Sequence, residues 1–188
     1  MGTKGHLSHD VLRQLLRYDP ETGKIFWLTR PLEFFNSNGH CKSWNTRYAN
    51  KEAFTAKNAA GYAHGRIFDC SYQAHRVIWA IQTGKWPVFE IDHVNHDASD
   101  NRWINLREAT SGQNKANRRS HNRSTSKYLG VCWDKREKKW RAQITSGNRK
   151  IAIGYFNCEI EAAKSYDAAA LKFHGSFANL NFSEGSIS

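Results

Sequence analysis

The stretch EIDHVNHDASDNRWINLREATSGQNKAN, residues 90–117, decides the fold of this chain. It gathers Asp92, His93, Asn105 and Asn114 within one short segment. A carboxylate and a carboxamide oxygen are hard donors that suit Mg2+ or Mn2+, and an imidazole that titrates near about 6.5 can take a proton from water. These residue types indicate a site where a divalent cation lies beside a base.

The polar and apolar residues of this segment predict two strands and a helix. A short apolar strand is expected at 88–91 and a second strand at 106–110, with a polar loop at 95–102 between them. Ser111 is expected to cap a helix that begins near Gly112. Strand, loop, strand and helix would form the core of a small α+β unit.

The residues directly before this unit predict a longer helix. It is expected to cover 72–83, with Val77, Ile78 and Ile81 on one face. Gly84 is its expected C-terminal stop. The apolar face indicates that this helix packs in a core beside the predicted site.

The N-terminal extension is expected to contain one helix and several short strands. Ser8 suits the N-cap of a helix whose apolar face holds Leu12, Leu15 and Leu16. Residues 31–50 have no apolar period and are expected to form a loop. The expected strands are residues 24–28, 52–57 and 66–72. We assign no chemistry to this extension.

The C-terminal stretch predicts a three-stranded antiparallel sheet covered by a helix. Strands at 128–133, 139–145 and 150–156 precede a helix at 159–174 that ends at Gly175. Apolar and polar positions alternate in the second strand, so one face packs on the helix and the other is basic and exposed. The exposed positions are Lys139, Arg141, Gln143 and Thr145.

The chain is strongly basic, with 28 Lys and Arg against 17 Asp and Glu and a net charge of +11. This balance favours a polyanionic partner, which we expect to be double-stranded DNA. Residues 118–127, RRSHNRSTSK, are expected to form a basic linker that tracks the DNA backbone, with a solvated tether as the alternative. The basic side chains of this linker are Arg118, Arg119, Arg123 and Lys127.

The expected organisation is a first part at 1–117, the linker at 118–127, a module at 128–182 and a tail at 183–188. The four cysteines are scattered without a C-x-x-C pair, so we expect no zinc and a reducing, cytoplasmic setting. The N-terminus lacks the apolar core of a signal peptide, and no apolar run approaches the length of a membrane span. No membrane partner is therefore expected.

Residues 75–117 resemble the HNH nucleases, also called the His-Me finger or ββα-metal group, and among them the homing-type endonucleases. The resemblance rests on His93, Asn105 and Asn114, twelve and nine residues apart, and on the flanking sequences AHRVIWA and NRWINL. Many relatives carry histidine where this chain has Asn114. The fold implied is α+β, with a ββα-metal core and an N-terminal extension of small strands.

The same resemblance implies roles for the four polar residues. His93 would activate water, and Asn105 would brace the loop and orient the histidine, so both are assigned to catalysis. Asp92 and Asn114 would ligate one divalent ion, Mg2+ or Mn2+, in each active site. The ion would stabilise charge on a phosphodiester and on the departing oxygen.

The sequences YLGV, KKWRAQI, IGYF, EAAKSYDAAALKFHG and ANLNF resemble an AP2 DNA-binding domain over the whole C-terminal module. The resemblance implies that the three-stranded sheet lies in the major groove. Several positions that are arginine or tryptophan in plant transcription factors differ here. We therefore expect the same docking mode on DNA but not the same target sequence. The implied DNA contacts are Lys139, Arg141, Gln143, Thr145, Lys150 and Tyr155.

Together these features predict a divalent-metal-dependent DNA endonuclease of homing or phage type that nicks one strand. It would act as a monomer, with a dimer as the alternative. A DNA-binding regulator that retains an inactive nuclease fold is the main other reading, because the amide of Asn114 is a weaker ligand than histidine. An RNA-binding or RNA-cleaving protein is a third, although nothing in the chain resembles an RNA-stacking module.

Overall fold

The computed structural model describes residues 6–117, 125–147 and 149–182. The chain divides into two compact units, Met1–Glu108 and Ala109–Ser188, each with helices and antiparallel sheets. The expected α+β class is confirmed. The functional boundaries at 117 and 127 stay predictions.

The first unit begins with a helix and a three-stranded sheet. Helix α1 covers His9–Leu15, and the hydroxyl of Ser8 accepts a hydrogen bond from the Val11 amide at 3.3 Å, which confirms the predicted N-cap. Leu16, expected on the helix face, instead starts strand β1, because its backbone is extended while its side chain stays in the core. Strands β1 (Leu16–Asp19), β2 (Lys24–Trp27) and β3 (Glu52–Ala53) pair in that order.

The predicted loop at 31–50 is wrong. This stretch contains the 3-10 helix η1, Leu32–Phe34, and the α-helix α2, Asn38–Tyr48. Helix α2 has no fully buried residue, so it shows no apolar period from which a helix could be predicted. The hydroxyl of Ser37 caps its first turn by accepting the His40 amide at 3.3 Å.

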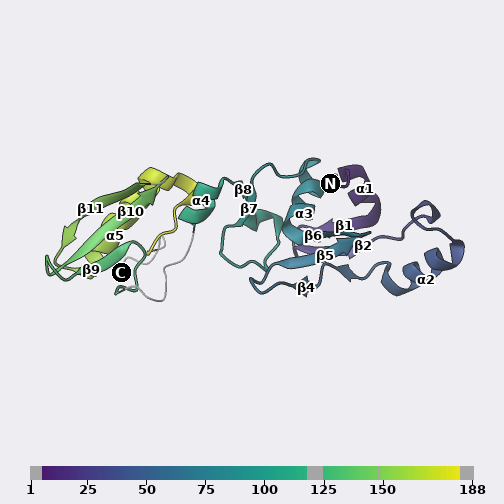
Figure 1. Ribbon diagram of the computed structural model, residues 1–188, viewed down its shortest axis with the longest axis horizontal. Coiled ribbons are helices and arrows are strands. Elements are labelled where there is room, and N and C mark those ends of the chain that lie inside the picture. The colour runs from purple at the N-terminus through teal and green to yellow at the C-terminus, as the bar shows by residue number, and fades with distance from the viewer. Residues whose placement is uncertain (1–5, 118–124, 148, 183–188) are drawn as a thin grey trace. The chain divides into compact units, whose positions relative to one another are not determined.

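A second three-stranded sheet and the central helix complete this unit (Figure 1). The sheet orders strands β4 (Ala56–Lys57), β5 (Ala63–Ile67) and β6 (Cys70–Gln73), so the single strand predicted at 66–72 is wrong. A tight turn folds that stretch back on itself, and Ile67 pairs with Cys70. Helix α3, Ala74–Thr83, buries Val77 and Ile78 completely. It ends at Gly84, whose φ of 75° confirms the predicted stop.

The quoted stretch forms a two-stranded ribbon, β7 (Glu90–His93) and β8 (Leu106–Ala109), with the 3-10 helix η2 (Trp103–Asn105) before β8. Helix α4 follows at Ser111–Ala116. Its N-cap is Thr110 rather than the expected Ser111, because Thr110 and Gln113 form a reciprocal capping box. Since α4 belongs to the second unit, its packing on the ribbon stays a prediction.

The second unit contains the predicted sheet and covering helix. Strands β9 (Val131–Asp134), β10 (Lys139–Ser146) and β11 (Arg149–Phe156) are antiparallel, in the order β11-β10-β9. Helix α5, Glu159–His174, has the predicted bounds and lies across one face of the sheet (Figure 1). Ala142 of β10 is fully buried, as are Ala162, Ala163 and Ala170 of α5, so small side chains allow the helix close to the sheet.

None of the helices within the described ranges is long and apolar enough to cross a membrane.

Candidate active site and DNA-binding sheet

Strand β7 places two adjacent polar residues at its buried end. Asp92 is 6% exposed and His93 is 5% exposed. Ile91, directly before them, belongs to the hydrophobic core of the first unit. The core thus fixes the strand, and the strand fixes the carboxylate and the imidazole next to it.

A buried contact joins the imidazole of His93 to the side chain of Asn101. The Nε2 atom of His93 lies 3.1 Å from the side-chain oxygen of Asn101. An amide oxygen can only accept, so this contact is a hydrogen bond in the tautomer that carries its proton on Nε2. Asn101 is 6% exposed and was missed in the sequence, because no motif spacing connects it to His93.

The loop between β7 and β8 is braced by Asn105. Its amide oxygen accepts the backbone N–H of Asn95 at 2.9 Å, and its amide nitrogen donates to the carbonyl of Asp100 at 2.7 Å. The carbonyl of Asn105 also accepts the N–H of Val94 at 2.9 Å. These contacts are those of a loop brace, the role that the resemblance implies for Asn105. A direct part in catalysis stays a prediction.

Asp92 is held by Arg107 of β8, a second residue that sequence reasoning did not assign to the site. The Nε and a terminal nitrogen of Arg107 both lie 2.8 Å from one oxygen of Asp92. The Arg107 side chain is 20% exposed, so the pair is largely withdrawn from water. The positive charge of Arg107 therefore partly neutralises the Asp92 carboxylate.

The side chain of His75 in α3 packs next to His93 and is uncharged near pH 7. The two imidazole rings are nearly perpendicular, with their centroids 5.3 Å apart. Burial, followed by the proximity of His93 and Arg76, lowers the pKa of His75 to about 3, so this ring is neutral near pH 7. Arg76 donates hydrogen bonds to the carbonyls of Phe89 and Pro87 and so braces the segment that leads into β7.

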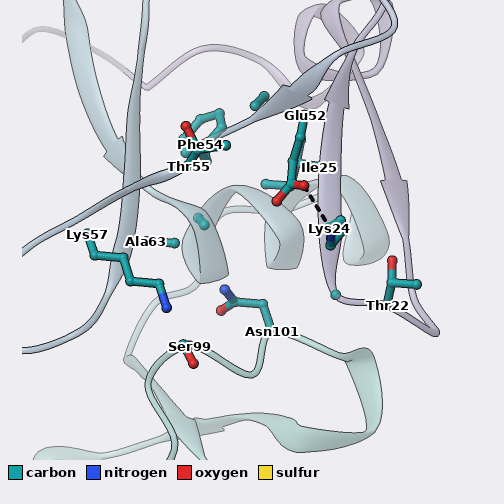
Figure 2. Close-up of a pocket in the computed structure, with 13 residues that line it drawn as sticks. Thr22, Lys24, Ile25, Glu52, Phe54, Thr55, Lys57, Ala63, Ser99 and Asn101 are labelled. Carbon is teal, nitrogen blue, oxygen red and sulfur yellow. Dashed lines mark hydrogen bonds and ion pairs between the residues drawn. The ribbon is translucent and has the colours of Figure 1, made fainter.

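The N-terminal extension contributes to a cavity beside Asn101. The cavity has a volume of about 210 Å3 and is lined by residues of the extension together with Ser99 and Asn101. Figure 2 shows Lys57, Ser99 and Asn101 around the same opening. Gly23 borders it with a φ of +73°, and a Cβ there would lie 2.6 Å from the backbone N of Arg102. The extension, to which we assigned no chemistry, thus brings a cation close to the histidine's partner.

The donor atoms of Asp92 and Asn114 suit a hard divalent cation. A carboxylate offers about four lone-pair directions, so Asp92 can be bound by Arg107 and still ligate a metal. Asn114, the second predicted ligand, is partly buried on α4 of the second unit. That Asn114 lies close enough to Asp92 to bind the same metal ion stays a prediction. Across the described part of the chain, no group of three or more His, Cys, Asp or Glu side chains is arranged to hold a metal ion.

The sheet of the second unit presents a polar face opposite α5. In β10, Ala142 and Ile144 are buried against the helix, while Lys139 and Thr145 are exposed and Arg141 and Gln143 are partly buried. This confirms the predicted alternation. The Nε of Arg141 has no hydrogen-bond partner within the described ranges. This nitrogen is buried, so a contact with DNA would have to come from the exposed part of the guanidinium, whose Nη1 lies 3.9 Å from a carboxylate oxygen of Asp134.

A β-bulge places Tyr155 on the same face. Arg141 pairs with Tyr155, and Gln143 pairs with Ala152, because the register shifts between Ala142 and Gln143. The extra residue on β11 resets its alternation, so Tyr155 (47% exposed) turns outward with Lys150. The neighbouring Phe156 turns toward the core.

The predicted linker contacts lie mostly outside the described residues. This holds for Arg118, Arg119 and Arg123. Lys127 is exposed, and its amine lies 5.1 Å from the ring centre of Tyr128.

Comparison with known proteins finds two families in the order predicted. Residues 72–116 match the model of the HNH endonuclease family, and residues 126–176 match that of the AP2 domain. The chain thus contains an HNH-type segment followed by an AP2-type segment, which confirms the resemblances seen in the sequence.

The similar curated proteins include two plant AP2-like transcription factors. The AP2-like ethylene-responsive transcription factor AIL7 of Arabidopsis thaliana is 35% identical over 95 residues, which are 50% of this chain and 18% of that protein. The AP2-like ethylene-responsive transcription factor CRL5 of Oryza sativa subsp. japonica is 42% identical over 62 residues, 32% of this chain and 10% of that protein. This chain therefore spans only a small part of either relative.

Proposed function

We propose that this protein is a divalent-metal-dependent DNA endonuclease that cuts one strand of double-stranded DNA. The observation that carries the proposal is the arrangement of His93, which is buried in an HNH-type segment and bonded through Nε2 to Asn101. In the tautomer that carries its proton on Nε2, Nδ1 would be the base. A homing or phage type of action is proposed only from the pairing of the two segments.

In the proposed reaction, Nδ1 of His93 takes a proton from the attacking water. Asn101 holds the ring and its tautomer, and Asn105 holds the loop that carries Asn101. Asp92 and Asn114 would hold one Mg2+ or Mn2+ ion. When bound, the ion supplies positive charge for the phosphate and the leaving oxygen. Lys57, at the neighbouring cavity, would contact a flanking phosphate.

DNA binding is proposed for the exposed face of the second sheet and the basic linker. The face offers positive charge and hydrogen-bond donors on adjacent strands, and a sheet of this width can enter the major groove. The proposed contacts are Lys139, Arg141, Gln143, Thr145, Lys150 and Tyr155 from the sheet and Arg118, Arg119, Arg123 and Lys127 from the linker.

One base in each chain predicts a nick as the first product. Supercoiled plasmid incubated with the protein and Mg2+ or Mn2+ should give open circles before linear DNA. The His93→Ala variant should lose at least about a hundredfold in rate but keep its affinity for the same plasmid. Linear product that appears without an open-circle stage would count against single-strand cutting.

A DNA-binding protein with an inactive nuclease segment is a second candidate. The ion pair between Asp92 and Arg107 favours it, because a neutralised carboxylate attracts a cation less strongly. One experiment distinguishes the two candidate functions. It measures DNA binding and DNA cleavage together over a range of Mg2+ and Mn2+ concentrations. Affinity without turnover at every concentration would support the second candidate.

A further inference from the structure

A buried cation without a charged partner lies far along the chain from the HNH-type residues. Arg30 is 7% exposed, and its Nε atom has no hydrogen-bond partner among the residues that the structure describes. The ion pairs found within those residues do not include it. Burial alone lowers the pKa of this guanidinium to about 10, so it remains charged at neutral pH. A desolvated cation that none of these ion pairs neutralises favours an external anion.

Aromatic rings fix the position of this guanidinium. Its central carbon lies 3.8 Å from the ring centre of Trp44, 4.6 Å from that of Trp27 and 5.4 Å from that of Phe68. The side chain of Asn45 holds the backbone of Arg30 at both its N–H and its carbonyl, each at 2.9 Å. The rings offer cation–π attraction but no strong acceptor for the N–H groups. The guanidinium is therefore fixed in position by rings and by its backbone, while its Nε has no hydrogen-bond partner among the described residues.

The same residues line an open cavity of about 490 Å3, which we call the Arg30 pocket. Its lining combines aromatic walls with two arginines and one carboxylate, namely Trp27, Arg30, Trp44, Tyr48, Arg66, Phe68 and Asp69. The charged lining residues sum to one net positive charge, from two arginines and one aspartate. This volume is far larger than a single carboxylate or phosphate needs, so the occupant has an apolar or aromatic part as well.

Phe68 is held at this pocket against its backbone preference. Its φ is 52°, in the left-handed region that bulky side chains rarely adopt, and 41% of the residue is exposed. Phe34 stacks on it with ring centres 5.7 Å apart. An apolar ring that is both strained and exposed suits a contact surface better than a core.

We propose that the Arg30 pocket receives one unpaired nucleotide of bound DNA, with the phosphate at Arg30 and Arg66 and the base against the aromatic side chains. Aromatic rings stack on any base, and a guanidinium suits a phosphate. A nucleotide fits better than an acidic peptide, because it brings an anion and a flat ring together. This proposal rests on the DNA binding proposed above but not on cleavage.

The test compares three duplexes that differ at one position. The full-length protein, in EDTA so that no metal-dependent cleavage occurs, is titrated with a fully paired duplex, the same duplex with one extra thymidine, and a third with an abasic residue in place of that thymidine. We expect the thymidine bulge to bind about tenfold more tightly than the other two, within the range for stacking one base on an aromatic ring.

Phe68→Ala should remove this preference, and Phe173→Ala is the matched control. Both phenylalanines are 41% exposed, but Phe173 lies on α5 and does not line the pocket. Arg30→Lys, which keeps the charge and loses the planar donor, should also weaken the preference.

Equal affinity of the wild-type protein for all three duplexes would overturn the proposal, as would a preference that survives both pocket variants. So would displacement of the bulged duplex by an oligoglutamate peptide but not by thymidine 5′-monophosphate. A chain that prefers the bulge but never cuts DNA would contradict the nuclease function alone.

Discussion

The amide oxygen of Asn101 and the Nε2 atom of His93 are 3.1 Å apart, and both side chains are at least nine-tenths buried. The pair connects the end of β7 to the loop that Asn105 braces. In the mechanism proposed above, Nδ1 of His93 is the base, so Asn101 is a positioning residue whose chemistry can be changed without removing that base.

Asn101→Asp should alter the pH dependence of cleavage. A carboxylate that faces Nε2 stabilises the protonated imidazole, so the low-pH limb of the rate profile should move upward by about one pH unit. Asn36→Asp, at an exposed position, should leave the profile unchanged. Single-turnover rates between pH 5 and 9 would show the shift. A variant whose rate falls equally at every pH would mean that Asn101 has only a structural role.

Arg107→Gln should destabilise the first unit by about 3–5 kcal/mol, because it removes the cation that pairs with the buried carboxylate of Asp92. Thermal or urea unfolding would measure the loss. Arg102→Gln is the matched control, since the Arg102 side chain that pairs with Asp100 is 51% exposed, against 20% for Arg107, and should contribute less. Adding Mn2+ should restore part of the stability of Arg107→Gln if Asp92 ligates the metal.

The stability of the first unit should fall as the solution becomes acidic. The folded-state pKa of His75, about 3, lies below its ordinary value of 6.5, so the unfolded chain takes up the proton first. This group therefore imposes no penalty above pH 6.5. Below it, stability is lost by at most about 1.4 kcal/mol per pH unit until the folded pKa is reached.

Urea unfolding between pH 6.5 and 5, above the range where most carboxylates titrate, would isolate this effect. His75→Gln should flatten the dependence, while the exposed His40→Gln should leave it unchanged. A wild-type stability that is constant over this range would contradict the assignment.

Arg141→Ala should weaken DNA binding and reduce its salt dependence. If Arg141 contacts a phosphate, the slope of the logarithm of affinity against the logarithm of salt should decrease by about one unit. Lys164→Ala on α5, exposed away from the polar face, should leave the slope unchanged. A loss of affinity without a change in slope would instead indicate a contact with a base.

Much of this architecture follows from local patterns. The ends of α5 and the outward face of β10 could be read from apolar spacing, because each element packs one side on a core. The position of Asp92 and His93 at a strand end follows from the short apolar run before them.

The features that escaped sequence reasoning depend on contacts between distant residues. Helix α2 buries no residue fully. It contacts the rest of the first unit through Trp44 and Asn45, which both lie against Arg30. The partners of the histidine and of its neighbouring carboxylate, Asn101 and Arg107, lie across a loop and a strand pairing. Such contacts leave no periodic signal in the chain.

The β-bulge in β11 lets this sheet change its length by one residue without changing which side chains face outward. Ile153 is the residue of β11 without an opposite residue in β10, because Ala142 pairs with Gly154 and Gln143 pairs with Ala152. Deleting Ile153 would restore simple alternation and leave Tyr155 opposite Arg141, with Phe156 still directed toward the core. Loss of this single codon would therefore alter the packing under α5, where Ile153 lies, while the outward face stays the same.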